Sequence, residues 1–155
     1  MPKTILIADD DENDAASLIY NLQAAGVGNP ILRVRDGNEA INYLAGTGEF
    51  ADRRLFPLPS VLFLDLKMPR VDGFGVLDWL QLRPLKTPIL VVALTGYLEY
   101  KNAQKAYQHG AHTFLTKPCV TEDIRNLRHV YAGYWEPSPL PEANAGETQS
   151  SLSPA

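Results

Sequence analysis

The chain has 155 residues, 45% of them hydrophobic, with 14 Lys and Arg against 18 Asp and Glu. This length accommodates one well-packed domain, and the mixed charges form no basic stripe, so direct nucleic-acid binding is not expected. Because Cys119 is the only cysteine, this chain alone cannot build a disulfide framework or a thiolate zinc site, which fits a reducing cytoplasm. The sequence shows no secretion leader and no apolar run long enough to cross a bilayer, so neither secretion nor membrane insertion is expected.

Short apolar runs alternate with longer amphipathic segments along the chain, a pattern typical of repeated βα units around a parallel sheet. Five strands are predicted, over residues 4–8, 31–35, 60–64, 88–94 and 113–115. The first, third and fourth runs are almost continuously apolar. They are therefore predicted to be central strands that helices cover on both faces.

Capping residues mark the ends of the predicted helices. An aspartate or a threonine precedes three of them: Asp36 before 37–45, Asp72 before 73–82 and Thr121 before 122–135. Glycines are predicted to end three helical segments, at Gly26, Gly46 and Gly110. The segment 47–59 contains several Gly and Pro residues and is predicted to be a long surface connection, either a structural loop or a partner-binding insertion.

The composition changes at residue 137 to Pro, Ser, Glu, Ala and Gly, with no aromatic residue. Such a segment buries too little apolar surface to offset the entropy of ordering, so 137–155 is predicted to be a disordered tail. No length then remains after the last helix for a DNA-binding or catalytic output domain. Any output is expected to come from the surface of the one folded domain.

Three acidic residues, Asp9, Asp10 and Asp11, follow directly after the first apolar run. Adjacent carboxylates repel one another, and a hard cation such as Mg²⁺, which prefers oxygen ligands, relieves that repulsion. Alternatively, one acid caps the following helix and the others are only solvated. These residues alone leave both interpretations open.

Three later strands end in groups that could act on a phosphoryl group. Asp65 ends the third strand, and its carboxylate is either a nucleophile beside Mg²⁺ or a simple strand-end cap. Thr95 follows the fourth strand, where its hydroxyl can donate to a phosphoryl oxygen and Gly96 leaves space for that oxygen. Lys117, which precedes Pro118 after the fifth strand, offers an ammonium that can bind phosphate.

These groups are predicted to converge, because the carboxyl ends of parallel strands lie at one edge of the sheet, where open α/β sheets bind ligands. From about residue 4 to about residue 135, the chain resembles the receiver domains of response regulators. The resemblance rests on four motifs in order: Ile-Leu-Ile-Ala-Asp9-Asp10-Asp11, Leu-Asp65-Leu-Lys-Met-Pro69-Arg-Val-Asp72-Gly73, Ala-Leu-Thr95-Gly96 and Phe114-Leu-Thr-Lys117-Pro118.

The resemblance implies an α/β, flavodoxin-like fold, with a doubly wound five-stranded parallel sheet of order 2-1-3-4-5 and helices on both faces. Residues 1–136 would form the receiver domain. Asp65 would be the phosphoacceptor, and Asp9 and Asp10 would be the acidic pair around Mg²⁺. Asp10 would be the direct ligand, and the backbone carbonyl of Lys67 would be a further one.

By the same resemblance, Thr95 and Lys117 are expected to move toward the phosphoryl group after transfer. Phe114 stands where the family has an aromatic residue that changes rotamer together with the switch hydroxyl. Phenylalanine has no hydroxyl, so a switch that needs a tyrosine hydrogen bond is not expected here. The peptide bond between Lys117 and Pro118 is expected to be cis.

The implied function is that of a single-domain response regulator of two-component signal transduction. A sensor histidine kinase or a phosphotransfer protein would phosphorylate it, and a surface change, not enzymatic activity, would carry the signal. Lys67 and Tyr97 occupy positions that flank the path of the hydrolytic water in this family, so their bulk is predicted to slow autodephosphorylation. The connection 47–59 and the Tyr134-Trp135 ending are similar to those of regulators paired with bacterial phytochrome kinases.

Two other classes of protein fit these residues less well. An aspartyl-phosphate hydrolase typically has a second acid two residues after the nucleophile, where this chain has Lys67. A flavin-binding electron carrier of the same fold needs a Gly/Ser/Thr-rich loop after the first strand. The acids found there would repel a flavin phosphate.

A homodimer is predicted through the face of the fourth helix, the fifth strand and the fifth helix, where apolar surface exceeds what a solvated face needs. The residues concerned are Tyr100, Tyr107, Val130 and Trp135. The alternative is that they cover the edge of the core.

A second set of residues is assigned to the core stripe of the last helix: Ile124, Leu127, Tyr131 and Tyr134. Structural or surface roles are predicted for the remaining candidates: His109, His112, His129 and Cys119.

Overall fold

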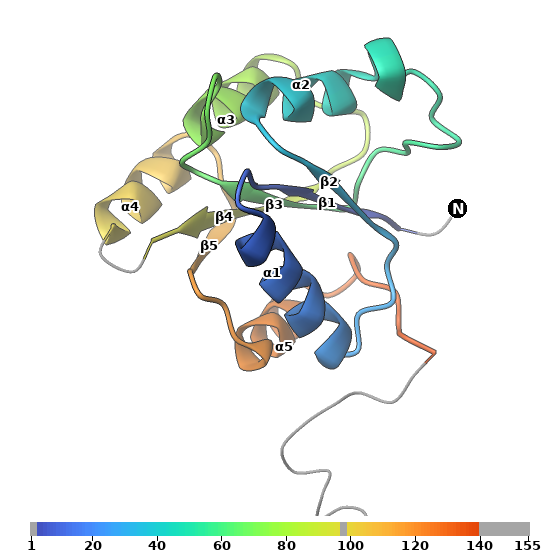
Figure 1. Ribbon diagram of the computed structural model, residues 1–155, viewed down its shortest axis with the longest axis vertical. Coiled ribbons are helices and arrows are strands. Elements are labelled where there is room, and N and C mark those ends of the chain that lie inside the picture. Colours follow the sequence, from blue (N-terminus) through green and yellow to red (C-terminus); the bar gives the residue numbers. More distant parts are fainter. Residues whose placement is uncertain (1–2, 97–98, 140–155) are drawn as a thin grey trace, which may run out of the picture.

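A computed structural model describes residues 3–96 and 99–139 of the chain (Figure 1). One parallel sheet lies at its centre, with the strand order β2-β1-β3-β4-β5. The strands are β1 (Ile5–Ala8), β2 (Ile31–Val34), β3 (Val61–Asp65), β4 (Leu90–Thr95) and β5 (Thr113–Thr116). The flavodoxin-like order implied by the resemblance is therefore confirmed, and the strand ends differ from the predicted ones by at most two residues.

The three central strands are buried along their whole length, as their continuous apolar runs predict. β2 and β5 form the edges of the sheet and are only partly buried. Pairing aligns Ile5 of β1 with Ile31 on one side and with Val61 of β3 on the other. Because both faces of the sheet are apolar, helices must cover both.

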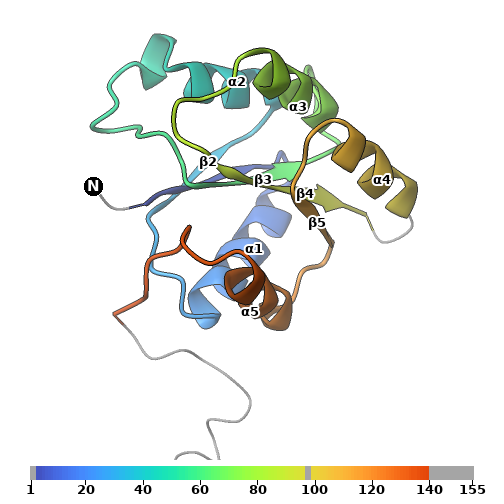
Figure 2. The same ribbon diagram turned by 180° about the vertical axis from the view of Figure 1, so that it is seen from behind.

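Five helices do so: α1 (Glu12–Ala24), α2 (Gly37–Ala45), α3 (Gly73–Leu82), α4 (Tyr100–Gln108) and α5 (Thr121–Val130). Figures 1 and 2 show α1 and α5 on one face of the sheet and α2, α3 and α4 on the other. Each face has its own core: Leu18, Ile124 and Leu127 pack on the first, and Tyr43, Leu44 and Val76 pack on the second. Within the described residues, no helix is long and apolar enough to cross a membrane.

Two of the predicted N-caps are confirmed. The Asp36 carboxylate accepts a hydrogen bond from the Glu39 amide at 2.8 Å, and that of Asp72 accepts one from the Gly75 amide at 3.0 Å. Asp11 has the same role at α1, because its carboxylate accepts from the amides of Asn13 and Asp14. The three stop glycines are also confirmed, since all adopt positive φ at helix ends: Gly26, Gly46 and Gly110.

The prediction for the last helix was wrong at both ends. α5 begins at Thr121, with Val120 at the capping position and its amide donating to the Asp123 carboxylate at 3.0 Å. It ends at Val130 rather than at Trp135. The indole of Trp135 instead packs near Phe63 beneath the sheet, with ring centroids 6.4 Å apart. Burial of this ring against β3 competes with continuation of the helix.

The segment 47–59 is an ordered structure on the end of α2. It contains a short 3₁₀ helix (Gly48–Phe50), and the Phe50 and Phe56 rings pack against Tyr43 with centroids 5.1 and 6.0 Å away. The guanidinium of Arg53 donates to the Tyr43 and Leu44 carbonyls at 2.7 and 2.8 Å. These are carbonyls that the end of a helix leaves without internal partners. The contacts favour the structural-loop interpretation.

The chain after α5 returns to the loop between α1 and β2. The Gly28 amide donates to the Glu136 carbonyl at 2.7 Å, and the Ser138 amide donates to the Gly26 carbonyl at 2.9 Å. A Cβ on Gly28 would lie 2.3 Å from the Pro137 carbonyl oxygen, so only glycine permits this approach. The predicted tail lies outside the described residues from residue 140 onward.

Candidate functional site

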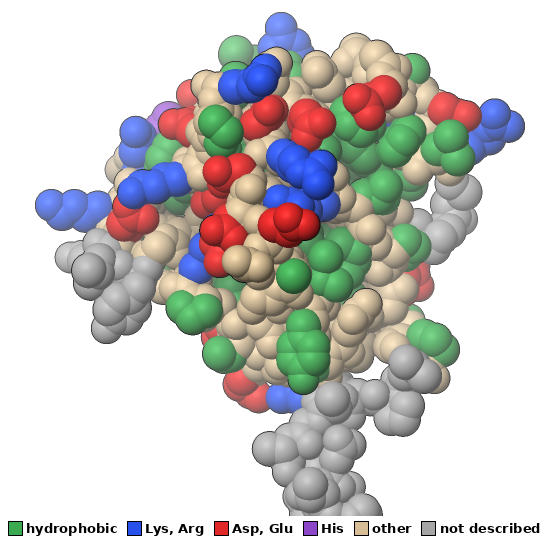
Figure 3. All heavy atoms as spheres, in the orientation of Figure 1, with side chains coloured by type: hydrophobic (Ala, Val, Ile, Leu, Met, Phe, Trp, Pro, Cys, Tyr) green, Lys and Arg blue, Asp and Glu red, His purple; other side chains and the backbone are tan. Residues whose placement is uncertain are grey.

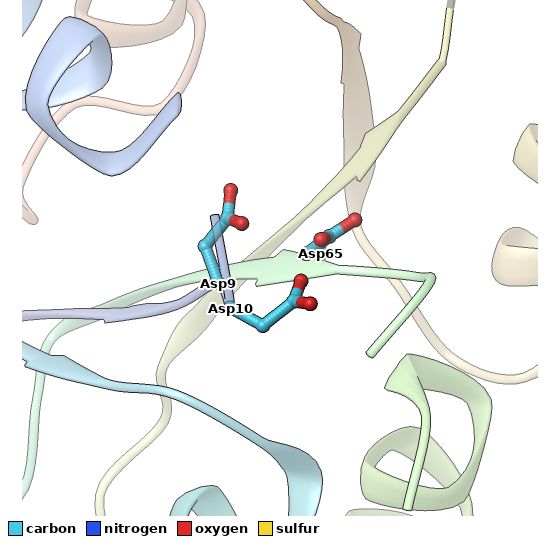
Figure 4. Close-up of side chains that lie close together, drawn as sticks. All are labelled: Asp9, Asp10 and Asp65. Atoms are coloured by element: carbon cyan, nitrogen blue, oxygen red, sulfur yellow. The ribbon is translucent and has the colours of Figure 1, made fainter. Parts of the chain in front are cut away.

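Three carboxylates meet at the carboxyl edge of the sheet. Asp9 and Asp10 follow β1, and Asp65 ends the neighbouring strand β3, so the sheet itself brings them together. One oxygen from each side chain lies within 4.8 Å of one from each of the others. Asp9 is 1% exposed and Asp65 7%, whereas Asp10 is exposed to solvent. Figure 4 shows Asp10 reaching toward Asp65, with Asp9 beside them.

The side chain of Lys117 enters this acidic group from the end of β5. Its Nζ lies 2.9 Å from Asp9 Oδ2 and 3.3 Å from Asp65 Oδ2. It also donates a hydrogen bond to Asp14 Oδ2 at 2.9 Å. The sequence analysis did not identify Asp14. Helical spacing gave no signal for it, because Asp9 and Asp10 lie before α1, which begins at Glu12.

Burial and neighbouring charges shift the acid–base properties of the site. Burial raises the pKa of the Asp65 carboxyl to about 6; the Lys117 ammonium opposes this rise, and the Asp9 carboxylate adds to it. Burial alone would lower the pKa of Lys117. The contacts with Asp9 and Asp14 outweigh burial, so that this pKa lies above its ordinary value. Lys117 is therefore a firmly held cation.

Thr95 ends β4 beside the same group and is 3% exposed. Its hydroxyl donates to the backbone carbonyl of Glu99 at 3.1 Å. The Lys67 amide donates to Asp65 Oδ1 at 3.2 Å, while the ammonium of Lys67 forms an ion pair with the Glu99 carboxylate. Sequence reasoning missed Glu99, since neither residue type nor spacing singles it out.

Most of the predicted site residues thus line one open cavity of about 220 Å³, while Asp9 is buried next to Asp10 and is not part of its lining. Its lining includes Asp10, Asp65, Lys67, Thr95 and Lys117, together with Asp14, Gly96 and Glu99. The Lys117–Pro118 peptide bond is cis, as expected. Phe114 is half-buried beside Tyr107, with ring centroids 5.9 Å apart. Tyr97 lies outside the described residues.

The other candidates lie away from this cavity. His109 Nδ1 is 2.6 Å from Asp78 Oδ1 on α3, and His112 Nδ1 accepts from the Val91 amide at 3.0 Å. Burial raises the pKa of the Cys119 thiol to about 11, so that it is not a reactive thiolate. On the face seen in Figure 3, the Lys and Arg side chains of the described residues are scattered among Asp and Glu.

The fold and the acidic site define the class of protein. Residues 5–128 match the family described as the response regulator receiver domain. The chain belongs to this family, whose members are signalling modules in two-component systems.

Individual relatives agree with this family assignment. Response regulator Rcp1 of Synechocystis sp. is 28% identical over 143 residues, which cover 92% of this chain and 95% of Rcp1. Among solved structures, response regulator RPA3017 of R. palustris is 30% identical with a TM-score of 0.76, covering 89% of this chain and 99% of its own. The bacteriophytochrome response regulator RtBRR is 30% identical with a TM-score of 0.77, covering 96% and 88%.

Proposed function

We propose that this chain is a cytoplasmic response regulator in which Asp65 receives the phosphoryl group. The observation that carries the proposal is the placement of Asp65. This buried carboxylate ends the central strand β3, shares a cavity with Asp10 and lies 3.3 Å from the Lys117 ammonium. It has an attacking oxygen, with further acids and a cation arranged around it.

A divalent cation fits the residues of the site. The three carboxylates are oxygen ligands of the kind that Mg²⁺ prefers, and one ammonium, that of Lys117, contacts two of them, Asp9 and Asp65. A solved structure of Rcp1 is described as its Mn²⁺-bound form. We assign Asp9, Asp10, Asp65 and the Lys67 carbonyl as the residues that would hold Mg²⁺. The cation would neutralise charge on the carboxylates and on the phosphoryl oxygens.

The transfer step itself uses residues of this chain. A carboxylate oxygen of Asp65 attacks phosphorus in line, the bond from phosphorus to the donor's imidazole nitrogen breaks, and its electron pair stays on that nitrogen. Lys117 and Thr95 then bind phosphoryl oxygens, through the ammonium and the hydroxyl respectively. Phe114 is proposed to change rotamer as Thr95 moves, since it lies on the adjacent strand β5.

Two further residues are proposed to set the lifetime of the phosphorylated state. The long side chain of Lys67 lines the same cavity as Thr95 and is ion-paired with Glu99. Together with Tyr97, it would obstruct the hydrolytic water. Small replacements at both positions should therefore speed the decay of the acyl phosphate, which loss of radiolabel over time measures.

The proposed phosphodonor is a histidine kinase or a phosphotransfer protein, and a bacterial phytochrome kinase in particular. RtBRR is described as a bacteriophytochrome response regulator, and RPA3017 as acting in red light signalling. Both resemble this chain over nearly their full lengths, and no described feature conflicts with the assignment. Phosphotransfer from a purified phytochrome kinase, compared between red and far-red light, tests it.

A homodimer through the α4–β5–α5 face stays part of the proposal in a reduced form. Tyr107 and Val130 on this face are 47% and 67% exposed. Trp135 does not belong to the face, because it packs beneath the sheet near Phe63. Sedimentation over a concentration series, with and without fluoroberyllate, tests the association; a monomer throughout would remove it.

Asp65→Asn tests the phosphoacceptor assignment. Incubation of the wild-type protein with Mg²⁺ and acetyl phosphate should add one phosphoryl group in an intact mass spectrum, and the variant should gain none. Asp78→Asn on α3 makes the same charge change outside the cavity and should leave labelling unchanged. Hydroxylamine-sensitive labelling of Asp65→Asn at the wild-type level would overturn the assignment.

A further inference from the structure

We propose that Glu99 is a latch that holds the site in its unphosphorylated arrangement and must be released for the phosphorylated state to form. The inference rests on the proposed phosphorylation of Asp65 and concerns what opposes it. Glu99 precedes α4 directly and lines the same cavity as Asp10, Asp14 and Asp65. Two of its groups, the backbone carbonyl and the carboxylate, bind residues that the phosphoryl group would also engage.

The first contact is made by the carbonyl, which accepts the hydrogen bond from Thr95 at 3.1 Å. A threonine hydroxyl has one proton to donate. It cannot donate to the Glu99 carbonyl and to a phosphoryl oxygen at once. Recruitment of Thr95 to the phosphoryl group therefore breaks this contact with Glu99.

The second contact is made by the carboxylate, which forms an ion pair with Lys67, another residue that lines the cavity. The pair links the loop after β3 to the residue that directly precedes α4. Gly96 makes room for it: a Cβ there would lie 2.6 Å from Glu99 Oε1. The Glu99 side chain is 30% exposed and that of Lys67 69%, so both can move without disturbing the core.

A phosphoryl group on Asp65 would act on both contacts in the same direction. Its negative oxygens attract the Lys67 ammonium and repel the Glu99 carboxylate, which lines the same cavity. Because the Glu99 carbonyl also accepts from the Asn102 amide at 2.8 Å, displacement of Glu99 reaches the first turn of α4. The latch thus couples occupancy of the site to the position of α4.

Glu99→Gln removes the ion pair and keeps the shape of the side chain. With saturating Mg²⁺, calorimetric titration should show about two- to fivefold tighter binding of fluoroberyllate, the range expected for a partly exposed ion pair. The matched control is Glu122→Gln, which removes the exposed pair with Arg125 on α5 and should leave the affinity unchanged. Without fluoroberyllate, the Asn102 amide resonance of Glu99→Gln should move toward its position in the fluoroberyllate-bound wild type.

Lys67→Met separates a latch from simple charge repulsion. If Glu99 only repelled the anion, Glu99→Gln would tighten fluoroberyllate binding by the same factor in the wild-type and in the Lys67→Met background. A latch predicts that this gain disappears in Lys67→Met, because the ion pair that holds Glu99 is already gone.

The outcomes distinguish the two proposals. A Glu99→Gln gain that persists in full in Lys67→Met, or a Glu99→Gln affinity equal to that of Glu122→Gln, overturns the latch alone. Absence of fluoroberyllate binding by the wild-type protein overturns the proposed function, and the latch with it.

Discussion

The amino and carboxyl edges of the sheet differ in how their polar side chains are arranged. At the amino edge, polar groups form hydrogen bonds with one another. The side chain of buried Asn29 donates to the Tyr134 carbonyl at 3.1 Å and accepts from the Glu136 amide at 2.6 Å. The Ser60 hydroxyl donates to the same Tyr134 carbonyl at 2.8 Å. At the carboxyl edge, three carboxylates crowd together, and the ammonium of Lys117 contacts two of them, Asp9 and Asp65.

The difference indicates where this domain is built for stability and where for chemistry. Buried polar groups with hydrogen-bond partners stabilise a fold, whereas crowded like charges destabilise it until a cation or a phosphoryl group changes their environment. Substitutions at the two edges should therefore change the free energy of unfolding in opposite directions.

The largest effect is expected at Asp65. Its folded pKa of about 6 lies above the usual 3.8, so the ionised carboxylate destabilises the metal-free fold above pH 6. In the presence of a chelator at pH 7.5, Asp65→Asn should raise the free energy of unfolding by roughly 2 kcal/mol, measured by urea denaturation. The gain should shrink as the pH falls from 6 toward 3.8, because the folded wild-type protein then takes up the proton. A constant gain across this range would contradict the electrostatic cause.

A change of opposite sign is expected at Asn29. Asn29→Ala removes both hydrogen bonds and leaves the Tyr134 carbonyl and the Glu136 amide without this partner, so the free energy of unfolding should fall by about 2 kcal/mol. Asn38→Ala, at an exposed position in α2, is the matched control. Labelling by acetyl phosphate should continue below the melting temperature. Loss of labelling from the folded Asn29→Ala protein would show that a change at the amino edge affects the site at the carboxyl edge.

Tyr43 tests a third region, the segment 47–59. Its buried hydroxyl donates to the Pro57 carbonyl at 2.9 Å, and burial raises its pKa to about 12. Tyr43→Phe keeps the ring packing and should lower the free energy of unfolding by about 1 kcal/mol. Thermal unfolding with and without Mg²⁺ measures the effect. If Mg²⁺ changes the size of this loss in the free energy of unfolding, the segment 47–59 is coupled to the site.

The smallest stability effect is expected at Asp10, which is exposed. Asp10→Ala should stabilise the metal-free fold by about 0.5 kcal/mol, because it removes one member of the acidic group, and should also weaken Mg²⁺ binding. Thermal unfolding in chelator and a Mg²⁺ titration are read together. Unchanged Mg²⁺ affinity would exclude the ligand role.

Local sequence was sufficient for the strands, most helix ends and the main site residues. Apolar runs specify buried strands, Asp36 and Asp72 cap helices through contacts three residues away, and both kinds of signal lie within a few positions. The convergence of Asp9, Asp65 and Lys117 also follows from the sequence, because parallel strands place their carboxyl ends at one edge.

Tertiary structure decided the contacts that join distant segments. Asp14 and Lys117 are 103 residues apart, and their hydrogen bond depends on the packing of α1 against α5, the helix that follows Lys117. The ion pair of Glu99 with Lys67 depends on the relative placement of two loops. Trp135 continues the helical pattern of the sequence, yet its large ring gains more from burial near Phe63 than the chain would gain from another helical turn. Helix propensity acts over about one turn of the chain. The contacts between distant segments depend instead on surfaces that exist only after the sheet and its helices have packed.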